Sequence, residues 1–224
     1  VDMPEALEML EPFGEGNPPP LFGLYHMKLE EITPVGGGKH LRLTFRKKDA
    51  VVHCMKFGTT AEDFPYRIGD EMDLAVSLDA REFRGEKQLS VLIRECRPSN
   101  SDFPALLRQQ RLYEQFRRGE GFRYGEGQQL LPSREDFAQV YRSLRQWGSW
   151  RGPEMFLWYR LGLPQLHMGK LLVMLDVMEE RGLILRNGKD EGFSIHLAPV
   201  QGKVDLTASP ILESLTREMK KEGA

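Results

Sequence analysis

HLRLTFR, His40 to Arg46, and EMDLAVSLDA, Glu71 to Ala80, are the two stretches that decide the fold of this 224-residue chain. In each of them apolar and polar side chains alternate with a period of two residues, which is typical of a strand in a sheet with one solvated face. The side chains expected to face inward are Leu41, Leu43 and Phe45 in the first stretch and Met72, Leu74, Val76 and Leu78 in the second.

Three more strand-like stretches flank this pair: LYHMKLEEI at 24–32, AVVHCMKF at 50–57 and QLSVLIREC at 88–96. GGGK at 36–39 and RGEK at 84–87 have the composition of tight turns. Thr59 with Glu62 three residues later predicts a short helix between the third and fourth strands. Five strands with a helix in that place are the plan of an OB-fold barrel.

The pattern becomes helical beyond Pro98. A basic helix is expected over 103–118 and a mobile, Gly-rich segment over 119–129. Three helices and a hairpin follow, which is the winged-helix arrangement, and then a last helix. The expected elements are a helix capped by Ser133 with Asp136, a helix from Pro153 to Gly162, a helix from His167 to Arg181, a hairpin over 183–197, and a helix from Ser209 and Pro210 toward Lys221.

The predicted fold class is therefore α+β with several domains. A connector is expected over 1–20, an OB-fold nucleic-acid-binding domain over 21–98, a basic helix and Gly-rich linker over 99–130, and a winged-helix-like domain over 131–224.

The composition is that of an ordinary globular protein, with 40% hydrophobic residues, 29% charged residues and a net charge of −2. The amino-terminal VDMPEALEML has no signal-peptide pattern, and no apolar run reaches the roughly 18 residues of a membrane span, so we predict a cytoplasmic protein. The chain begins with Val1 and is interpreted as a piece of a longer protein. Cys54 and Cys96 are too few for a structural zinc site and are expected to be reduced core residues.

A basic stripe offers a candidate surface for nucleic acid, because a chain with an acidic balance can still bind it locally. Between Lys39 and Lys56 the sequence holds six cations and a single acid, Asp49.

LEPFGEGNPPPLF, Leu10 to Phe22, is the most specific string in the chain. It closely resembles the segment that leads into the OB domain of RecJ exonucleases. KHLRLTF, the KFG at 56–58, IGDEMDLAVSL and FRGEKQLSVLIRECRP resemble the successive strands of that domain, so the resemblance covers about residues 5–98. From Leu131 onward the chain resembles, more weakly, the carboxy-terminal extension of some RecJ proteins. Taken on its own residues, the Pro- and Gly-rich string is interpreted as a rigid connector.

The resemblance implies that this chain is the non-catalytic carboxy-terminal part of a bacterial 5′–3′ single-stranded-DNA exonuclease, a hydrolase of DNA repair and recombination. The family's nuclease chemistry uses divalent metal ions, Mn²⁺ or Mg²⁺, held by Asp and His residues in upstream domains. Here the five histidines are scattered and lack carboxylates at ligand spacing. GGGKH at 36–40 also lacks the earlier Gly and the following Ser or Thr of a phosphate-binding loop. We therefore expect no catalytic residue, metal ligand or cofactor in this chain.

OB-folds hold single strands with cations along the phosphates and aromatic faces under the bases. We expect the contacts on the second and third strands and the last hairpin of the barrel, where such folds bind. The predicted DNA-binding residues are Lys39, His40, Arg42, Arg46, Lys56, Phe57, Arg81, Phe83, Arg84 and Lys87.

The function of residues 131–224 stays open. The helix over 165–181 has the position of a recognition helix, yet its LLVMLDVM run is typical of a core. We interpret this domain as a dock for a protein such as single-stranded-DNA-binding protein or a recombination helicase, by analogy of fold. Two other function classes fit the sequence: a protein-interaction adaptor whose OB-fold binds no DNA, and a winged-helix binder of duplex DNA.

Overall fold

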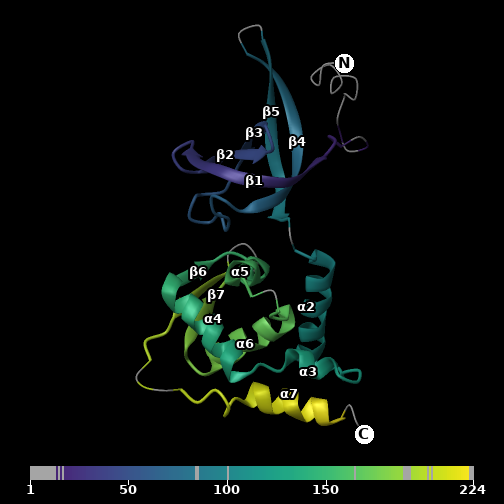
Figure 1. The fold of residues 1–224 in the computed structure, drawn as a ribbon, viewed down its shortest axis with the longest axis vertical. Coiled ribbons are helices and arrows are strands. Elements are labelled where there is room, and N and C mark those ends of the chain that lie inside the picture. Colours follow the sequence, from purple (N-terminus) through teal and green to yellow (C-terminus); the bar gives the residue numbers. More distant parts are fainter. Residues whose placement is uncertain are drawn as a thin grey trace. The chain divides into compact units, whose positions relative to one another are not determined.

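The structure, a computed structural model, describes residues 14, 16, 18–83, 86–99, 101–163, 165–188, 193–200, 202 and 204–221, with the backbone alone at 80–83 and 86–88. The chain forms two compact units, Val1–Asn100 and Ser101–Ala224 (Figure 1). Most of the connector predicted over 1–20, including residues 10–13, 15 and 17 of the Leu10 to Phe22 string, lies outside the described residues.

The first unit is a closed barrel with the strand order β1-β2-β3-β5-β4. Its strands are β1 (Phe22–Val35), β2 (His40–Lys47), β3 (Ala50–Lys56), β4 (Glu71–Phe83) and β5 (Glu86–Pro98). Neighbouring strands are antiparallel except β3 and β5, which run parallel. The prediction of a five-stranded, OB-like barrel is confirmed.

Alternation along the strands fills the barrel interior. The side chains predicted to face inward are buried at all but one position: Leu41, Leu43, Phe45, Met72, Leu74 and Val76. The exception is Leu78, which is half-buried. The last pairing of β4 with β1 is at Val76, so β4 has already left the closed part of the barrel at Leu78.

The segment between β3 and β4 differs from the prediction. Residues 57–70 are all described and contain turns, so the short helix expected at Thr59 to Glu62 is wrong. Thr60 closes a single turn instead, where its hydroxyl accepts the Asp63 N–H at 3.2 Å and its carbonyl accepts the Phe64 N–H at 3.1 Å. Pro65 ends the turn, because the residue before a proline is disfavoured in the helical region.

The second unit is mainly helical with a small sheet of order β6-β8-β7. The predicted helices and the hairpin are present, and the capping box of Ser133 and Asp136 forms as expected. The strand β6 was not predicted. The elements are α2 (Phe103–Arg117), α3 (Glu126–Leu130), α4 (Arg134–Trp147), β6 (Ser149–Arg151), α5 (Glu154–Leu161), α6 (Met168–Glu180), β7 (Ile184–Asn187), β8 (Ser194–Leu197) and α7 (Pro210–Lys221).

Helix α6 is the centre of this unit. Apart from Lys170, every residue from Met168 to Met178 is buried. Helix α2 packs closely on it: a Cβ added at Gly169 would lie 2.6 Å from the Gln109 carbonyl oxygen. The side-chain oxygen of Gln109 also accepts the Met168 N–H at 2.7 Å, which satisfies a free donor at the start of α6.

Residues 99–130, set apart above as a helix and linker, contribute to the same core. Leu106, Leu112 and Phe116 of α2 and Leu130 of α3 are buried in it. The expected mobile segment includes α3, and its Phe122 stacks on Phe116 with ring centroids 6.1 Å apart. The basic helix is therefore amphipathic, with its apolar side in the core of the second unit.

A charged network joins α2, α6 and the hairpin. Asp176 is only 6% exposed, and its carboxylate accepts the Tyr113 hydroxyl at 2.8 Å and the Arg186 guanidinium at 2.6 Å. Arg117 lies 3.3 Å from the same carboxylate. Burial, followed by the charge of Asp176, raises the Tyr113 pKa well above its ordinary value, so the phenol remains a hydrogen-bond donor.

Candidate nucleic-acid interface

The outward-pointing side chains of β1, β2 and β3 form one continuous surface, the outer face of the barrel. Side chains opposite one another on neighbouring strands lie close together, about 5 Å apart at Cβ. Three rows cross the face from β1 to β2 to β3: Thr33, Arg42 and Met55; Glu31, Thr44 and His53; and Lys28, Arg46 and Val51.

The predicted cations differ in how free they are. Arg42 and Lys39 are exposed, and within the described residues neither forms an ion pair. Arg46 is exposed as well, but its Nε donates to the Glu30 carboxylate at 2.7 Å. Lys56 stands opposite the inward-facing Leu41, so it lies off the outer face, and its ammonium donates to the Arg94 carbonyl at 3.2 Å. Among the predicted cations whose side chains the structure describes, Arg42 and Lys39 are thus the two that are ready to meet a phosphate.

His40 and Phe57 make an aromatic corner at one end of the outer face. Their rings meet edge to face with centroids 5.0 Å apart, and 55% of Phe57 is exposed. The Gly58 N–H donates to Nδ1 of His40 at 3.0 Å, so this imidazole nitrogen is the acceptor and the ring is held in place. An exposed aromatic ring beside free cations is the arrangement on which OB-folds stack a base.

A β-bulge puts two consecutive acids on the outer face. In β1 the pairing runs from Leu29↔Phe45 directly to Glu31↔Thr44, so Glu30 is the extra residue. The bulge resets the alternation, and Glu31 therefore shares the outer side with Glu30. Hydrogen bonds from Thr33 and then Thr44 lower the Glu31 pKa, and the charges of Arg42 and His53 act in the same direction.

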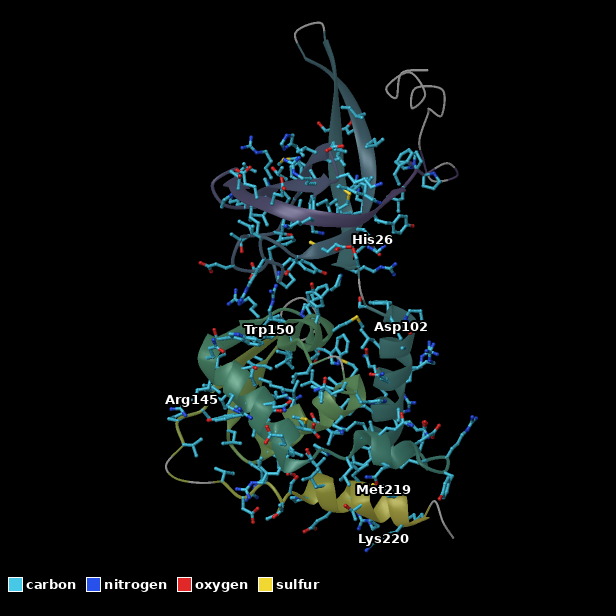
Figure 2. The ribbon with its side chains drawn as sticks, in the orientation of Figure 1. His26, Asp102, Arg145, Trp150, Met219 and Lys220 are labelled. Atoms are coloured by element: carbon cyan, nitrogen blue, oxygen red, sulfur yellow. The ribbon has the colours of Figure 1, made fainter. Side chains whose placement is uncertain are left out.

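The side of the barrel where β1 pairs with β4 has a different character. His26, labelled in Figure 2, adopts a left-handed backbone (φ 56°) at a second irregularity of β1. Its N–H donates to Asp73 at 3.1 Å and its Nδ1 lies 2.7 Å from the Glu71 carboxylate. Arg97 pairs with Asp73 at 3.3 Å. The carboxylates of β4 thus already hold Arg97 and the His26 ring there, which leaves the outer face as the better anion-binding surface.

The last hairpin of the barrel holds the remaining predicted residues. The backbone pairs Arg81 with Gln88, Glu82 with Lys87 and Phe83 with Glu86. The side chains of Arg81, Phe83 and Lys87, and the whole of Arg84, lie outside the described residues, so their contacts with DNA stay predictions.

The sequence analysis missed one residue of this surface. His53 is exposed on the outer face, and its Nδ1 lies 3.2 Å from the Thr44 hydroxyl. Alternation pointed to His53, because its neighbour Cys54 faces inward. Lys47 follows Arg46 and has the opposite parity, so it lies off the outer face, and its ammonium donates to the Tyr25 carbonyl at 2.8 Å.

The described ranges also bear on metal binding, thiol chemistry and membrane insertion. They contain no group of three or more His, Cys, Asp and Glu side chains arranged to hold a metal ion. Neither cysteine forms a disulfide, and burial raises the Cys54 pKa to about 12, which keeps this thiol protonated. Among the helices so described, none has the length and apolar character needed to cross a membrane.

Comparison with known proteins gives one family match. The RecJ OB domain family matches residues 1–95. The crystal structure of RecJ in complex with Mg²⁺ from Thermus thermophilus is 28% identical with a TM-score of 0.32, and the match covers 45% of this chain and 16% of that one. The Mn²⁺ complex of RecJ from the same organism is 27% identical with a TM-score of 0.31, over 45% of this chain and 15% of that one.

The chain therefore spans only a small part of these two proteins. No curated protein matches it. The family match coincides with the closed five-stranded barrel. Residues 1–95 thus carry an OB domain of the RecJ OB domain family.

Proposed function

We propose that the barrel binds single-stranded DNA along its outer face, with phosphates on Arg42 and Lys39 and a base on Phe57. The observation that carries the proposal is the half-exposed Phe57 ring beside His40, at the end of a strip with two cations that the described residues leave unpaired. Such contacts are independent of base sequence, because phosphates and aromatic faces are common to all nucleotides. The family match supports DNA as the ligand.

In this proposal the barrel serves a RecJ-like 5′–3′ single-stranded-DNA exonuclease of repair and recombination. The barrel grips the strand, while the catalytic residues and their divalent metal ions belong to other regions of the protein. The grip raises the affinity for the strand and the number of nucleotides removed in one encounter.

A second proposal concerns residues 131–224, which we infer to be a protein dock. The order α4, β6, α5, α6, β7, β8 supports a winged-helix fold. In a DNA-binding winged helix the second or third helix presents an exposed side to the major groove. Here ten of the thirteen residues of α6 are buried, which favours a protein partner over duplex DNA. The candidates are single-stranded-DNA-binding protein and a recombination helicase.

Fluorescence anisotropy of the whole chain with a labelled oligothymidine, and with the matching duplex, tests the first proposal. Binding to the single strand should be micromolar or tighter and weaker to the duplex, with a log–log salt slope of about −0.7 per phosphate contact. Arg42→Ala should weaken it and reduce that slope by about 0.7. Arg97→Ala, which removes the same charge from β5, is the matched control. Equal loss in both variants, or tighter binding to the duplex, contradicts the proposal.

A further inference from the structure

Two carboxylates lie among the cations of the outer face. The bulge at Glu30 puts this side chain beside Arg46, at 2.7 Å, and brings Glu31 into the row of Thr44 and His53. The next row holds Arg42, whose charge acts on Glu31. Without the bulge, alternation would turn Glu31 toward the barrel interior.

These carboxylates are held in place. Glu31 accepts the Thr33 hydroxyl at 2.8 Å and the Thr44 hydroxyl at 3.3 Å. Glu30 accepts Nε of Arg46 and is only partly exposed, its side chain at 33%. A DNA strand whose phosphates follow the face from Lys39 toward Arg46 therefore passes two fixed negative charges. At Arg46 its phosphate competes with the Glu30 carboxylate for the same guanidinium.

We propose that Glu30 and Glu31 limit the affinity of the barrel for single-stranded DNA, and that Arg46 exchanges Glu30 for a phosphate when the strand binds. This inference rests on the proposed function of the outer face. Before the strand binds, Arg46 is paired with Glu30. Binding of the strand therefore gains only the difference in free energy between the Arg46–phosphate contact and the Arg46–Glu30 contact. Binding is thereby kept weak enough for a strand to move along the surface.

The electrostatics of the two states give the sign of the effect. In the free protein Glu30 and Arg46 compensate one another, whereas in the complex Glu30 is left beside a phosphate of like charge. Glutamine keeps the size and the hydrogen-bond acceptor of both side chains and removes only the charge. Glu30→Gln and Glu31→Gln should therefore tighten binding, and the Arg46 freed by Glu30→Gln should add to the number of counterions released.

The test is anisotropy with labelled oligothymidine on the whole chain and its Glu30→Gln, Glu31→Gln and doubly substituted variants. Each single change should tighten binding about two- to fivefold, the range for one exposed ion pair. In Glu30→Gln, which frees Arg46, the log–log salt slope should also become steeper by about 0.7. Glu95→Gln is the matched control, because Glu95 is exposed on β5 opposite Ala75 of β4 and carries the same charge. Its affinity should stay within about twofold of the parent chain.

A double-mutant cycle tests whether Arg46 is the residue through which Glu30 acts. If Glu30 acts through Arg46, the tightening caused by Glu30→Gln should disappear in an Arg46→Gln background. Unchanged or weaker binding of Glu30→Gln and Glu31→Gln, in a chain whose binding depends on Arg42, overturns this inference and leaves the proposed function standing. Failure of the parent chain and of the double variant alike to bind overturns both. Binding by the double variant alone supports both.

Discussion

The rings of His40 and Phe57 meet edge to face with centroids 5.0 Å apart, and the Gly58 N–H donates to Nδ1 of the imidazole at 3.0 Å. This contact joins the start of β2 to the residue after β3, so the exposed aromatic surface is part of the rigid barrel. A stacking platform needs this rigidity, because a side chain that is already ordered loses little entropy when a base binds.

Phe57→Ala should weaken binding of oligothymidine about tenfold or more, since stacking on an aromatic side chain contributes about 1–3 kcal/mol per base. The thermal midpoint should hardly move, because 55% of the side chain is exposed. Ile68→Ala is the control, as Ile68 is an apolar residue of the same unit with 64% exposure. An equal loss of affinity in both variants would remove Phe57 from the site.

Binding to oligothymidine should strengthen at acid pH. The Glu31 pKa is lowered, chiefly by the Thr33 hydroxyl, so this carboxylate keeps its charge until the pH falls below the ordinary Glu range. Protonation then removes a charge that opposes the phosphates. In Glu31→Gln this component of the pH dependence should be missing; an identical pH profile in the two proteins would contradict the role of Glu31.

Asp176→Ala should destabilise the helical unit by about 1–3 kcal/mol, because it leaves the Tyr113 hydroxyl without its buried acceptor, while Arg186 keeps its pair with Glu179. Urea unfolding followed by tryptophan fluorescence reports this unit alone, since all three tryptophans lie at 147, 150 and 158. Glu135→Ala is the control: its pair with Arg142 is about two-thirds exposed, and its loss should cost less than about 1 kcal/mol.

The stability of the helical unit should also fall as the pH drops from about 6.5 toward 4. Burial, with the charge of Lys170, lowers the His167 pKa to about 4, so the folded state favours the neutral imidazole. Between pH 6.5 and 4 His167 is protonated in the unfolded chain but neutral in the folded one, so acid favours unfolding. His167→Gln should flatten this part of the curve, whereas the exposed His196→Gln should leave it unchanged.

Gly169→Ala tests the contact between α2 and α6. Alanine favours a helix over glycine by about 1 kcal/mol, but its methyl group would meet the Gln109 carbonyl oxygen and the Leu130 side chain at 2.6 Å. The net result should be a loss of about 1–3 kcal/mol. Gly121→Ala, which has open space at this position, should be neutral; a stabilised Gly169→Ala would show that the two helices are not in close contact.

Local sequence pattern was sufficient to predict most of the helices and strands. The alternation of HLRLTFR set β2 and its buried side, and Ser133 with Asp136 set the start of α4. The short helix after β3 failed because the local capping pattern at Thr59 competes with Pro65 and with the burial of Phe64 and Tyr66. Strand β6 was missed because three residues carry too little periodicity and depend on pairing with β8.

The candidate site was predictable in its cations and its aromatic residue, but not in its acids. Arg42, Arg46 and Phe57 follow from alternation and charge. The bulge at Glu30 is a property of the β1–β2 register, and alternation alone assigns Glu31 to the wrong side of the strand. The free state of Arg42 and the paired state of Arg46 follow from this register and not from either residue's neighbours in sequence.

Ultraviolet crosslinking of oligothymidine to the whole chain, followed by mapping of the attached peptide, tests the central claim most directly. The predicted crosslink is at Phe57, in the tryptic peptide that begins after Lys56, with a second one at Phe83 if the hairpin takes part. Crosslinks confined to residues 101–224, or to the β1 and β4 side around Tyr25, would contradict binding along the outer face.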